Sequence, residues 1–83
     1  MPDEIVEEPI AVTAGFAQGA VTPTALSWAG REHALSAVHA RWETREGACC
    51  VRHFSVETAS GDLFHIAFYT ESMTWRLERV LMP

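Results

Sequence analysis

The chain contains no lysine, and its positive charge comes entirely from six arginines. Eleven acidic residues outnumber them, so the formal net charge is -5 at pH 7. Nucleic acid is a disfavoured partner on this balance, because binding driven by counterion release requires several clustered cations. A GC-rich genome is the simplest explanation for arginine in place of lysine, whereas a surface of guanidinium forks for carboxylate or phosphate groups is the functional alternative.

Long apolar runs and targeting signals are also missing. No stretch approaches about 18 consecutive apolar residues, and the first residues lack the basic and apolar regions of a secretory signal. We therefore expect a soluble, cytoplasmic protein without membrane contact.

Motifs for catalysis and cofactor binding are absent as well. Gly15 and Gly19 match neither the Walker nor the dinucleotide-binding pattern, and no nucleophile elbow is present. Glu57 and Glu78 are expected at solvent-facing strand positions, where charges are normally solvated rather than catalytic. We therefore predict no catalytic residue, no cofactor and no enzymatic activity.

Cysteine is scarce, and its two positions do not suit a disulfide. Cys49 and Cys50 are adjacent, and neighbours on a strand point to opposite faces, so a bond between them would be strained. With His53 and His65 they form the best candidate for a metal site. Zinc needs four converging ligands, however, and only Cys49 shares the outer face with the two histidines. We therefore expect reduced thiols and no bound metal.

The remaining composition is that of one small folded domain. Hydrophobic residues make up 48% of the 83 residues, a length that supports a single small core. Acidic residues are concentrated in residues 1–8, which we interpret as a disordered, solvated tail that ends at Pro9. Residues 9–83 then form a single β domain.

Alternating apolar residues dominate the C-terminal half, with a period of two that is typical of half-buried strands. A turn around Gly61 places Val56 opposite Phe64, and a second turn at residues 71–72 places Phe68 opposite Trp75. Val80 and Met82 are then expected on the other face of the last strand. These expectations predict the following core: Leu26, Trp28, Phe54, Val56, Phe64, Ile66, Phe68, Trp75 and Leu77.

The N-terminal half is less regular. We predict a short strand at residues 9–13, and then a loop at residues 14–20 whose Phe16 tucks under the edge of the core. A hairpin at residues 23–38 turns at the Ala29-Gly30 pair, with Leu26 facing His33. A helix over residues 31–46 is the alternative, because apolar residues there also recur at spacings of three and four.

The predicted fold is mainly β: an antiparallel meander of about six strands, strongly twisted or partly closed into a small barrel, with one short helix near residues 37–46 left open. Such a meander exposes two edge strands. Because Ile10 and Val12 on the first strand need a partner, we expect a homodimer through edge pairing or through apolar residues such as Val80 and Met82.

Contacts with a partner are expected from arginines and from aromatic residues outside the alternating pattern. Trp42 and Tyr69 are such aromatics, and nearby or turn-flanking arginines complete the predicted contact set: Arg31, Trp42, Arg52, Tyr69 and Arg76. The protein is therefore predicted to be a non-catalytic binding or accessory module. Exposed rings beside arginines also favour an alternative, the weak binding of single-stranded nucleic acid.

Three segments carry a resemblance to a known family. They are L-S-W-A-G-R at residues 26–31, F-S-V-E-T followed by G, F and I at residues 54–69, and W-R-L-E-R-V at residues 75–80. Together they resemble an uncharacterised small bacterial domain that occurs alone or appended to Y-family polymerase-like proteins of the ImuB type. The resemblance implies an association with DNA repair. The family has no assigned activity, so it implies no role for a particular residue.

Overall fold

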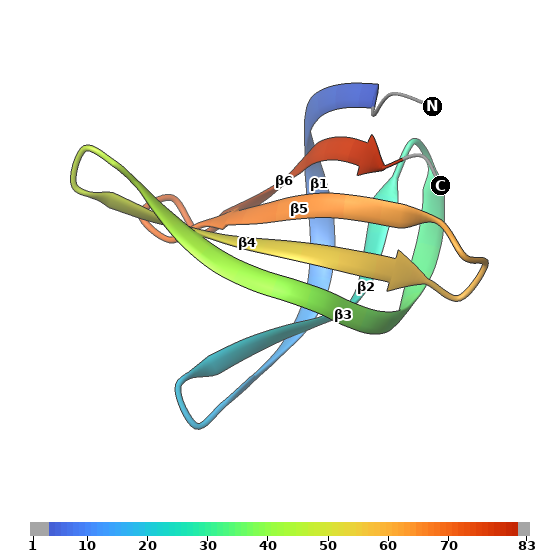
Figure 1. Cartoon of the computed structure of the whole chain (residues 1–83), viewed down its shortest axis with the longest axis horizontal. Coiled ribbons are helices and arrows are strands. Elements are labelled where there is room, and N and C mark those ends of the chain that lie inside the picture. The colour runs from blue at the N-terminus through green and yellow to red at the C-terminus, as the bar shows by residue number, and fades with distance from the viewer. Residues whose placement is uncertain (1–3, 82–83) are drawn as a thin grey trace.

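The computed structural model describes residues 4–81, which form six antiparallel strands in a closed barrel with neighbours in chain order (Figure 1). No helix long and apolar enough to span a membrane occurs among these residues. The prediction of a mainly β meander that closes into a small barrel is confirmed. The strands are β1 (Glu4–Ala17), β2 (Ala20–Trp28), β3 (Arg31–Glu46), β4 (Cys49–Thr58), β5 (Leu63–Tyr69) and β6 (Thr74–Leu81).

The first strand closes the barrel by pairing with both of its neighbours. Its first half pairs with β6, from Glu4 opposite Val80 to Ile10 opposite Trp75, and its second half pairs with β2. The prediction of a disordered tail over residues 1–8 is therefore wrong for residues 4–8, and residues 1–3 lie outside the described residues. The acidic side chains of residues 4–8 are exposed, but their backbone joins the sheet. The acidic composition therefore indicated the solvation of these side chains but not the strand that their backbone forms.

Strand β1 has partners within the chain at residues 9–13, which were expected to form a free edge. Pro9 and Ile10 lie opposite β6, and the residues that follow lie opposite β2. Residues 9–10 pair with β6 on one side and residues 11–13 pair with β2 on one side, and self-association stays a prediction.

The predicted loop at residues 14–20 is instead a hairpin. Strands β1 and β2 continue to a two-residue turn at Gln18 and Gly19, which have φ of 54° and 77°, as favoured hairpin turns require. Phe16 pairs with Val21 and is 64% exposed, so the expectation that it tucks under the core is wrong. Figure 1 shows the reason, because this two-stranded ribbon projects beyond the body of the barrel.

The next turn agrees with the sequence. Ala29 and Gly30 have φ of 54° and 75°, and the strands on either side pair Trp28 with Arg31 and Leu26 with His33, as predicted. Pairing between β2 and β3 ends at Ala25 and Ala34. Beyond that pair β3 leaves β2 and joins β4.

A single long strand replaces the helix that was left open near residues 37–46. The register of β3 against β4 shifts between Leu35 and Ala37 and again between Val38 and Ala40, so β3 carries two β-bulges. Each bulge inserts one residue and reverses the alternation of faces. Two bulges so close together give apolar residues the spacings of three and four that imitate a helix.

The last three strands follow the predicted registers. Val56 lies opposite Phe64, Ile66 lies opposite Leu77 and Phe68 lies opposite Trp75. Gly61 has a φ of 94°, the left-handed backbone that the turn required of it. The interior of the barrel is therefore filled by side chains from alternate positions on these strands.

Val80 departs from the predicted pattern. Ile66 pairs with Leu77, but His65 pairs with Arg79, so Glu78 is an extra residue in β6. This bulge turns Val80 inward, where it lies opposite Phe64 and packs against the core instead of facing outward. Met82, expected beside it on the outer face, lies outside the described residues.

The core sits inside the barrel and contains the residues that the alternation predicted. Trp28 is half-buried with its ring edge-on to Phe64, at 5.9 Å between ring centroids. Val21, which was not predicted, is also buried in this core. The predicted residues that are buried are Leu26, Phe54, Val56, Phe64, Ile66, Phe68, Trp75 and Leu77.

Candidate partner-binding surfaces

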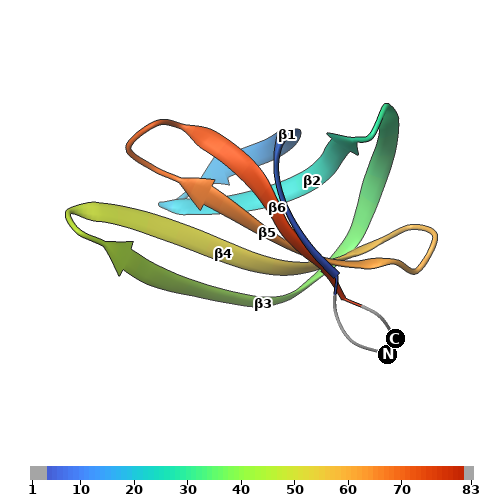
Figure 2. The same cartoon turned by 90° about the horizontal axis from the view of Figure 1, so that it is seen from above.

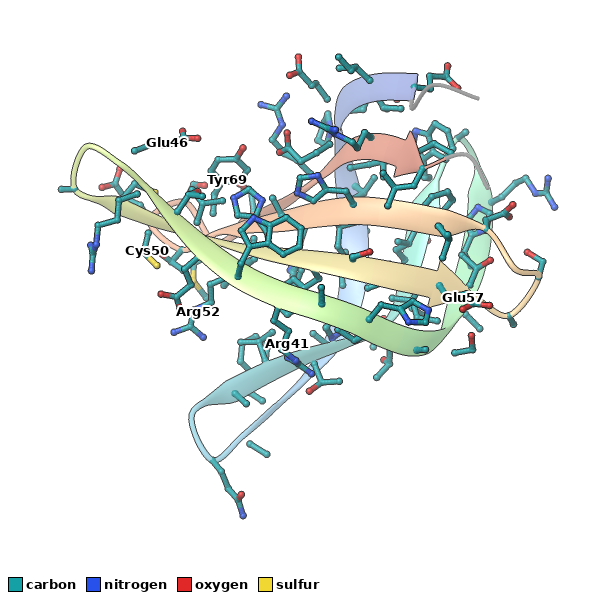
Figure 3. All side chains as sticks on the ribbon, viewed as in Figure 1. Arg41, Glu46, Cys50, Arg52, Glu57 and Tyr69 are labelled. Atoms are coloured by element: carbon teal, nitrogen blue, oxygen red, sulfur yellow. The ribbon has the colours of Figure 1, made fainter. Side chains whose placement is uncertain are left out.

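The predicted contact residues fall at three places on the barrel. Trp42, Tyr69 and Arg76 lie on the outer face of the sheet formed by β3 to β6. Arg52 lies at the end of the barrel where the β1–β2 and β3–β4 turns project (Figure 3). Arg31 follows the β2–β3 turn at the opposite end, so it does not join the others.

A group of aromatic and polar side chains covers the outer face, and we call it the outer-face cluster. His53 is its centre: a hydrogen bond of 2.9 Å joins its Nδ1 to His65 Nε2, and Thr44 Oγ1 lies 2.8 Å from its Nε2. The Trp42 ring stacks on His53, with 5.2 Å between centroids and an interplanar angle of 6°. The cluster comprises Trp42, Thr44, His53, His65, Tyr69, Arg76 and Glu78.

This cluster hides two small apolar residues that point away from the main core. Val51 shares the face of His53 on β4, and Ala67 lies directly opposite His53 on β5. Both are 0% exposed. The outer-face cluster is therefore a packed second layer over the sheet, and not a set of independent solvated side chains.

Tyr69, Glu78 and Arg76 form the end of the cluster nearest β6. The Tyr69 hydroxyl donates to Glu78 Oε2 at 2.9 Å, and the Arg76 guanidinium lies 6.0 Å from the centre of the Tyr69 ring. Burial, and then the hydrogen bond to the Glu78 carboxylate, raise the pKa of Tyr69 to about 12. The phenol therefore stays protonated and remains a hydrogen-bond donor at neutral pH.

The two histidines of the cluster are held in the neutral form. Burial lowers the pKa of His53, and burial followed by the adjacent His53 lowers the pKa of His65. The Glu78 carboxylate acts in the opposite direction on both pKa values without overcoming burial. A direct bond between two imidazole nitrogens also requires one of them to lack a proton.

We expect the free energy of unfolding to decrease as the pH falls below about 6.5, the ordinary pKa of histidine. The unfolded chain then takes up protons at His53 and His65 that the folded chain takes up only at lower pH. The loss levels off once the pH is below the lowered pKa values. Urea unfolding from about pH 8 to about pH 5 measures the effect. A His53→Gln/His65→Gln double variant should show a shallower decline, and an unchanged decline would contradict the assignment.

A groove lies at the end of the barrel where the β1–β2 ribbon projects, and we call it the open-end groove. Its volume is about 440 Å³. Phe16 from β1 and Met73 from the β5–β6 turn line it and are 64% and 67% exposed, whereas Val21 and Phe68 form its buried apolar part. Arg52 is the charged residue in its lining.

A second hollow of about 300 Å³ shares Val21 and Arg52 with this groove and extends toward Arg41 and Glu43. Arg41 Nη1 donates to the carbonyl oxygen of Val21 at 2.6 Å. Arg52 Nε lies 3.5 Å from Glu43 Oε2, and this buried nitrogen has no hydrogen-bond partner among the described residues. Two guanidinium groups and one carboxylate thus line the same hollow, an arrangement that can accept a further anionic oxygen.

Sequence reasoning found Arg52 but missed the residues that surround it. Phe16 was assigned to the edge of the core, and Met73 was not considered. The two residues lie near turns in opposite halves of the chain, and the sequence does not show that these turns come together in the fold. Arg41 carried a weak signal, since it precedes Trp42 on a strand and must therefore face the opposite side.

The described residues contain no group of three or more histidine, cysteine, aspartate or glutamate side chains that could hold a metal ion. His53 and His65 are diagonal neighbours on the outer face, as predicted. Cys49 and Cys50 are free thiols, and Cys49 Sγ lies 3.7 Å from the Cys50 carbonyl oxygen.

Comparisons with protein-family models, with curated proteins and with solved structures found no match to this chain. The resemblance to the polymerase-associated family therefore stays a prediction, and the surfaces must be interpreted from their own chemistry.

Proposed function

We propose that this protein is a non-catalytic binding module whose open-end groove takes up a segment of a partner protein. The segment would carry apolar side chains and a carboxylate. The observation that supports the proposal is the exposure of two large apolar side chains, Phe16 and Met73, along one groove that also contains Arg52. Exposed apolar groups beside a charged group are typical of contact surfaces.

The charges of the groove and of the hollow beside it favour an acidic segment over a basic one. Arg41 and Arg52 outnumber Glu43 at this end, and Arg52 Nε makes no hydrogen bond. A carboxylate that enters the hollow beside the guanidinium groups would balance this charge and accept hydrogen bonds from their terminal nitrogens. The outer-face cluster supports the assignment by contrast, because its polar groups already bond in pairs, His53 with His65 and Tyr69 with Glu78.

We further propose DNA repair as the biological setting of this binding. The support is the sequence resemblance over residues 23–81 to a domain that is found beside polymerase-like proteins. A partner from such an assembly would bind through its own acidic and apolar segment, so the proposal requires no contact with nucleic acid.

Selection from a random-peptide library displayed on phage tests the groove directly. We expect enriched peptides to combine aromatic or aliphatic residues with aspartate or glutamate. Fluorescence anisotropy with one enriched, labelled peptide should then show affinity weakened about tenfold or more by Phe16→Ser or by Met73→Ser, because each removes a large apolar contact. Arg52→Gln should weaken the acidic peptides and affect neutral ones much less.

Ile5→Ser is the matched control, since Ile5 is 70% exposed but does not line the groove. Equal weakening by this variant, or no weakening by the groove variants, would place the binding elsewhere. A labelled single-stranded oligonucleotide provides the comparison with the alternative function. If the oligonucleotide binds, if added salt weakens this binding and if Trp42→Ala abolishes it, nucleic-acid binding is favoured over the peptide groove.

A further inference from the structure

The C-terminal half of β3 is an edge because it pairs with a neighbouring strand on one side only, as parts of β1 and β2 also do. On one side β3 pairs with β4 from Leu35 to Glu46, but on the other side it pairs with β2 only over residues 31–34. No strand among residues 4–81 pairs with the free side of residues 36–46. Residues 39–46 are all exposed, and in Figures 1 and 2 this part of β3 runs along the outside of the molecule.

Such an edge offers a row of unpaired backbone donors and acceptors to another strand. Arg41 makes this visible within the chain, because its guanidinium, and not the N–H of an adjacent strand, reaches the carbonyl of Val21 on β2. Proline and lysine, which often protect exposed edges, do not occur in residues 36–46. The two bulges precede residue 40, so residues 40–46 form a regular stretch of edge that is available to a strand of complementary charge.

The side chains along this edge are complementary to themselves. Residues 40–46 follow the two bulges and pair regularly with β4, so their faces alternate strictly. Arg41, Glu43 and Arg45 share one face, and Trp42 and Thr44 share the other. An antiparallel pair of identical edges has a twofold axis, which must pass beside one residue that lies opposite its own copy.

The charges along the edge favour one position of the twofold axis over the others. A centre at Glu43 places Glu43 opposite itself and Arg41 opposite Arg45, so like charges meet at every position of that face. A centre at Trp42 places Arg41 of each copy opposite Glu43 of the other, and it places the two Trp42 rings side by side. A centre at Thr44 pairs Glu43 with Arg45 but places Trp42 opposite Glu46. The centre at Trp42 alone combines two ion pairs with an aromatic pair.

We propose that the protein forms a homodimer in which the free edges of β3 pair antiparallel about a twofold axis at Trp42. Each sheet then continues into the other, and the 41% exposed ring of Trp42 becomes covered. Arg41 has donors enough to contact Glu43 of the second copy while it holds the Val21 carbonyl. Phe16 and Met73 lie on other elements, whereas Arg41 and Glu43 also line the hollow beside the groove, so the serine variants of Phe16 and Met73 are the ones that separate peptide binding from dimerisation.

Disulfide formation between introduced cysteines tests the register in which the two β3 edges pair. In a Cys49→Ser/Cys50→Ser background, we expect Ala40→Cys mixed with Thr44→Cys to form a disulfide-linked dimer under mild oxidation, because these positions lie opposite each other when the axis is at Trp42. Opposed Cα atoms in an antiparallel pair are about 4.5 to 5.5 Å apart, which suits a disulfide. Thr44→Cys alone should link poorly, and its rapid linkage would instead place the axis at Thr44 and contradict the proposal.

Charge exchange tests the same interface without a covalent bond. Sedimentation equilibrium at micromolar concentration should give twice the 9.2 kDa chain mass for the wild type. Arg41→Glu or Glu43→Arg alone should weaken dimerisation about tenfold, because each places like charges opposite one another twice per dimer. The double exchange should restore it, which also shows that the variants fold.

Three results would overturn the proposal. One is a 9.2 kDa mass at every concentration. Another is a dimer that neither charge variant weakens, since its interface must then lie elsewhere. The last is disulfide linkage of the Ala40→Cys and Thr44→Cys mixture no faster than that of Ile5→Cys, another exposed position, away from the β3 edge.

Discussion

Replacement of Phe64 by alanine should lower the free energy of unfolding by about 3 to 5 kcal/mol, enough to unfold most of a domain of this size. Phe64 is 3% exposed, and its ring meets Trp28 and His33 edge-on at centroid distances of 5.9 and 5.4 Å. It lies between Val56 and Val80 in the sheet. Truncation therefore removes buried surface and leaves a cavity whose walls belong to four different strands.

Urea unfolding monitored by tryptophan fluorescence measures this effect, and Phe16→Ala is its control. The same chemical change at Phe16, which is 64% exposed, should alter the free energy of unfolding by less than about 0.5 kcal/mol. A loss below about 1 kcal/mol for Phe64→Ala would mean that Phe64 does not point into the barrel.

Replacement of Thr58 by valine should lower the free energy of unfolding by about 1 to 3 kcal/mol even though the shape of the side chain is kept. Thr58 is 1% exposed, and its Oγ1 accepts a hydrogen bond of 3.0 Å from the backbone N–H of Asp62. The same oxygen lies 3.1 Å from Ser60 Oγ. A methyl group leaves both partners without this bond inside the turn that sets the register of β4 and β5.

Thr24→Val provides the matched control in the same unfolding measurement. The hydroxyl of Thr24 donates to the carbonyl of Thr13 at 3.1 Å, but Thr24 is exposed, so water can replace that bond. We expect a change of less than about 0.5 kcal/mol there. If Thr58→Val and Thr24→Val lower the free energy of unfolding by the same amount, the buried hydroxyl of Thr58 does not stabilise the turn.

The C-terminal half of the fold was predictable because its information is local. Short turns at Gly61 and at residues 71–72 join strands with strict alternation, so the turn length fixes which residues face each other. Val56, Phe64 and Trp75 follow from this rule alone. Val80 does not, because the bulge at Glu78 reverses the alternation and no residue type in β6 marks its position.

The N-terminal half was less predictable because its shape depends on distant partners. Residues 4–8 look like a solvated tail until β6 lies beside them, and the bulges of β3 imitate the spacing of a helix. The candidate surfaces divide in the same way. Trp42 and Tyr69 could be predicted to face outward because they lie outside the alternating core pattern. The proximity of Phe16 to Met73, in contrast, arises only when the barrel closes.

The pairing of β1 with β6 has a consequence for how this protein folds. The other neighbouring strands are consecutive along the chain and are joined by short turns, so their hairpins can form on a microsecond scale. Closure of the barrel instead brings together distant residues, such as Glu7 and Arg76, which are 69 positions apart and joined by a hydrogen bond. The entropy cost of closing a loop grows with its length. Because contacts between distant residues form slowly, we expect the closure of this seam to be the slow step of folding. During synthesis β1 emerges first and waits longest for its partner.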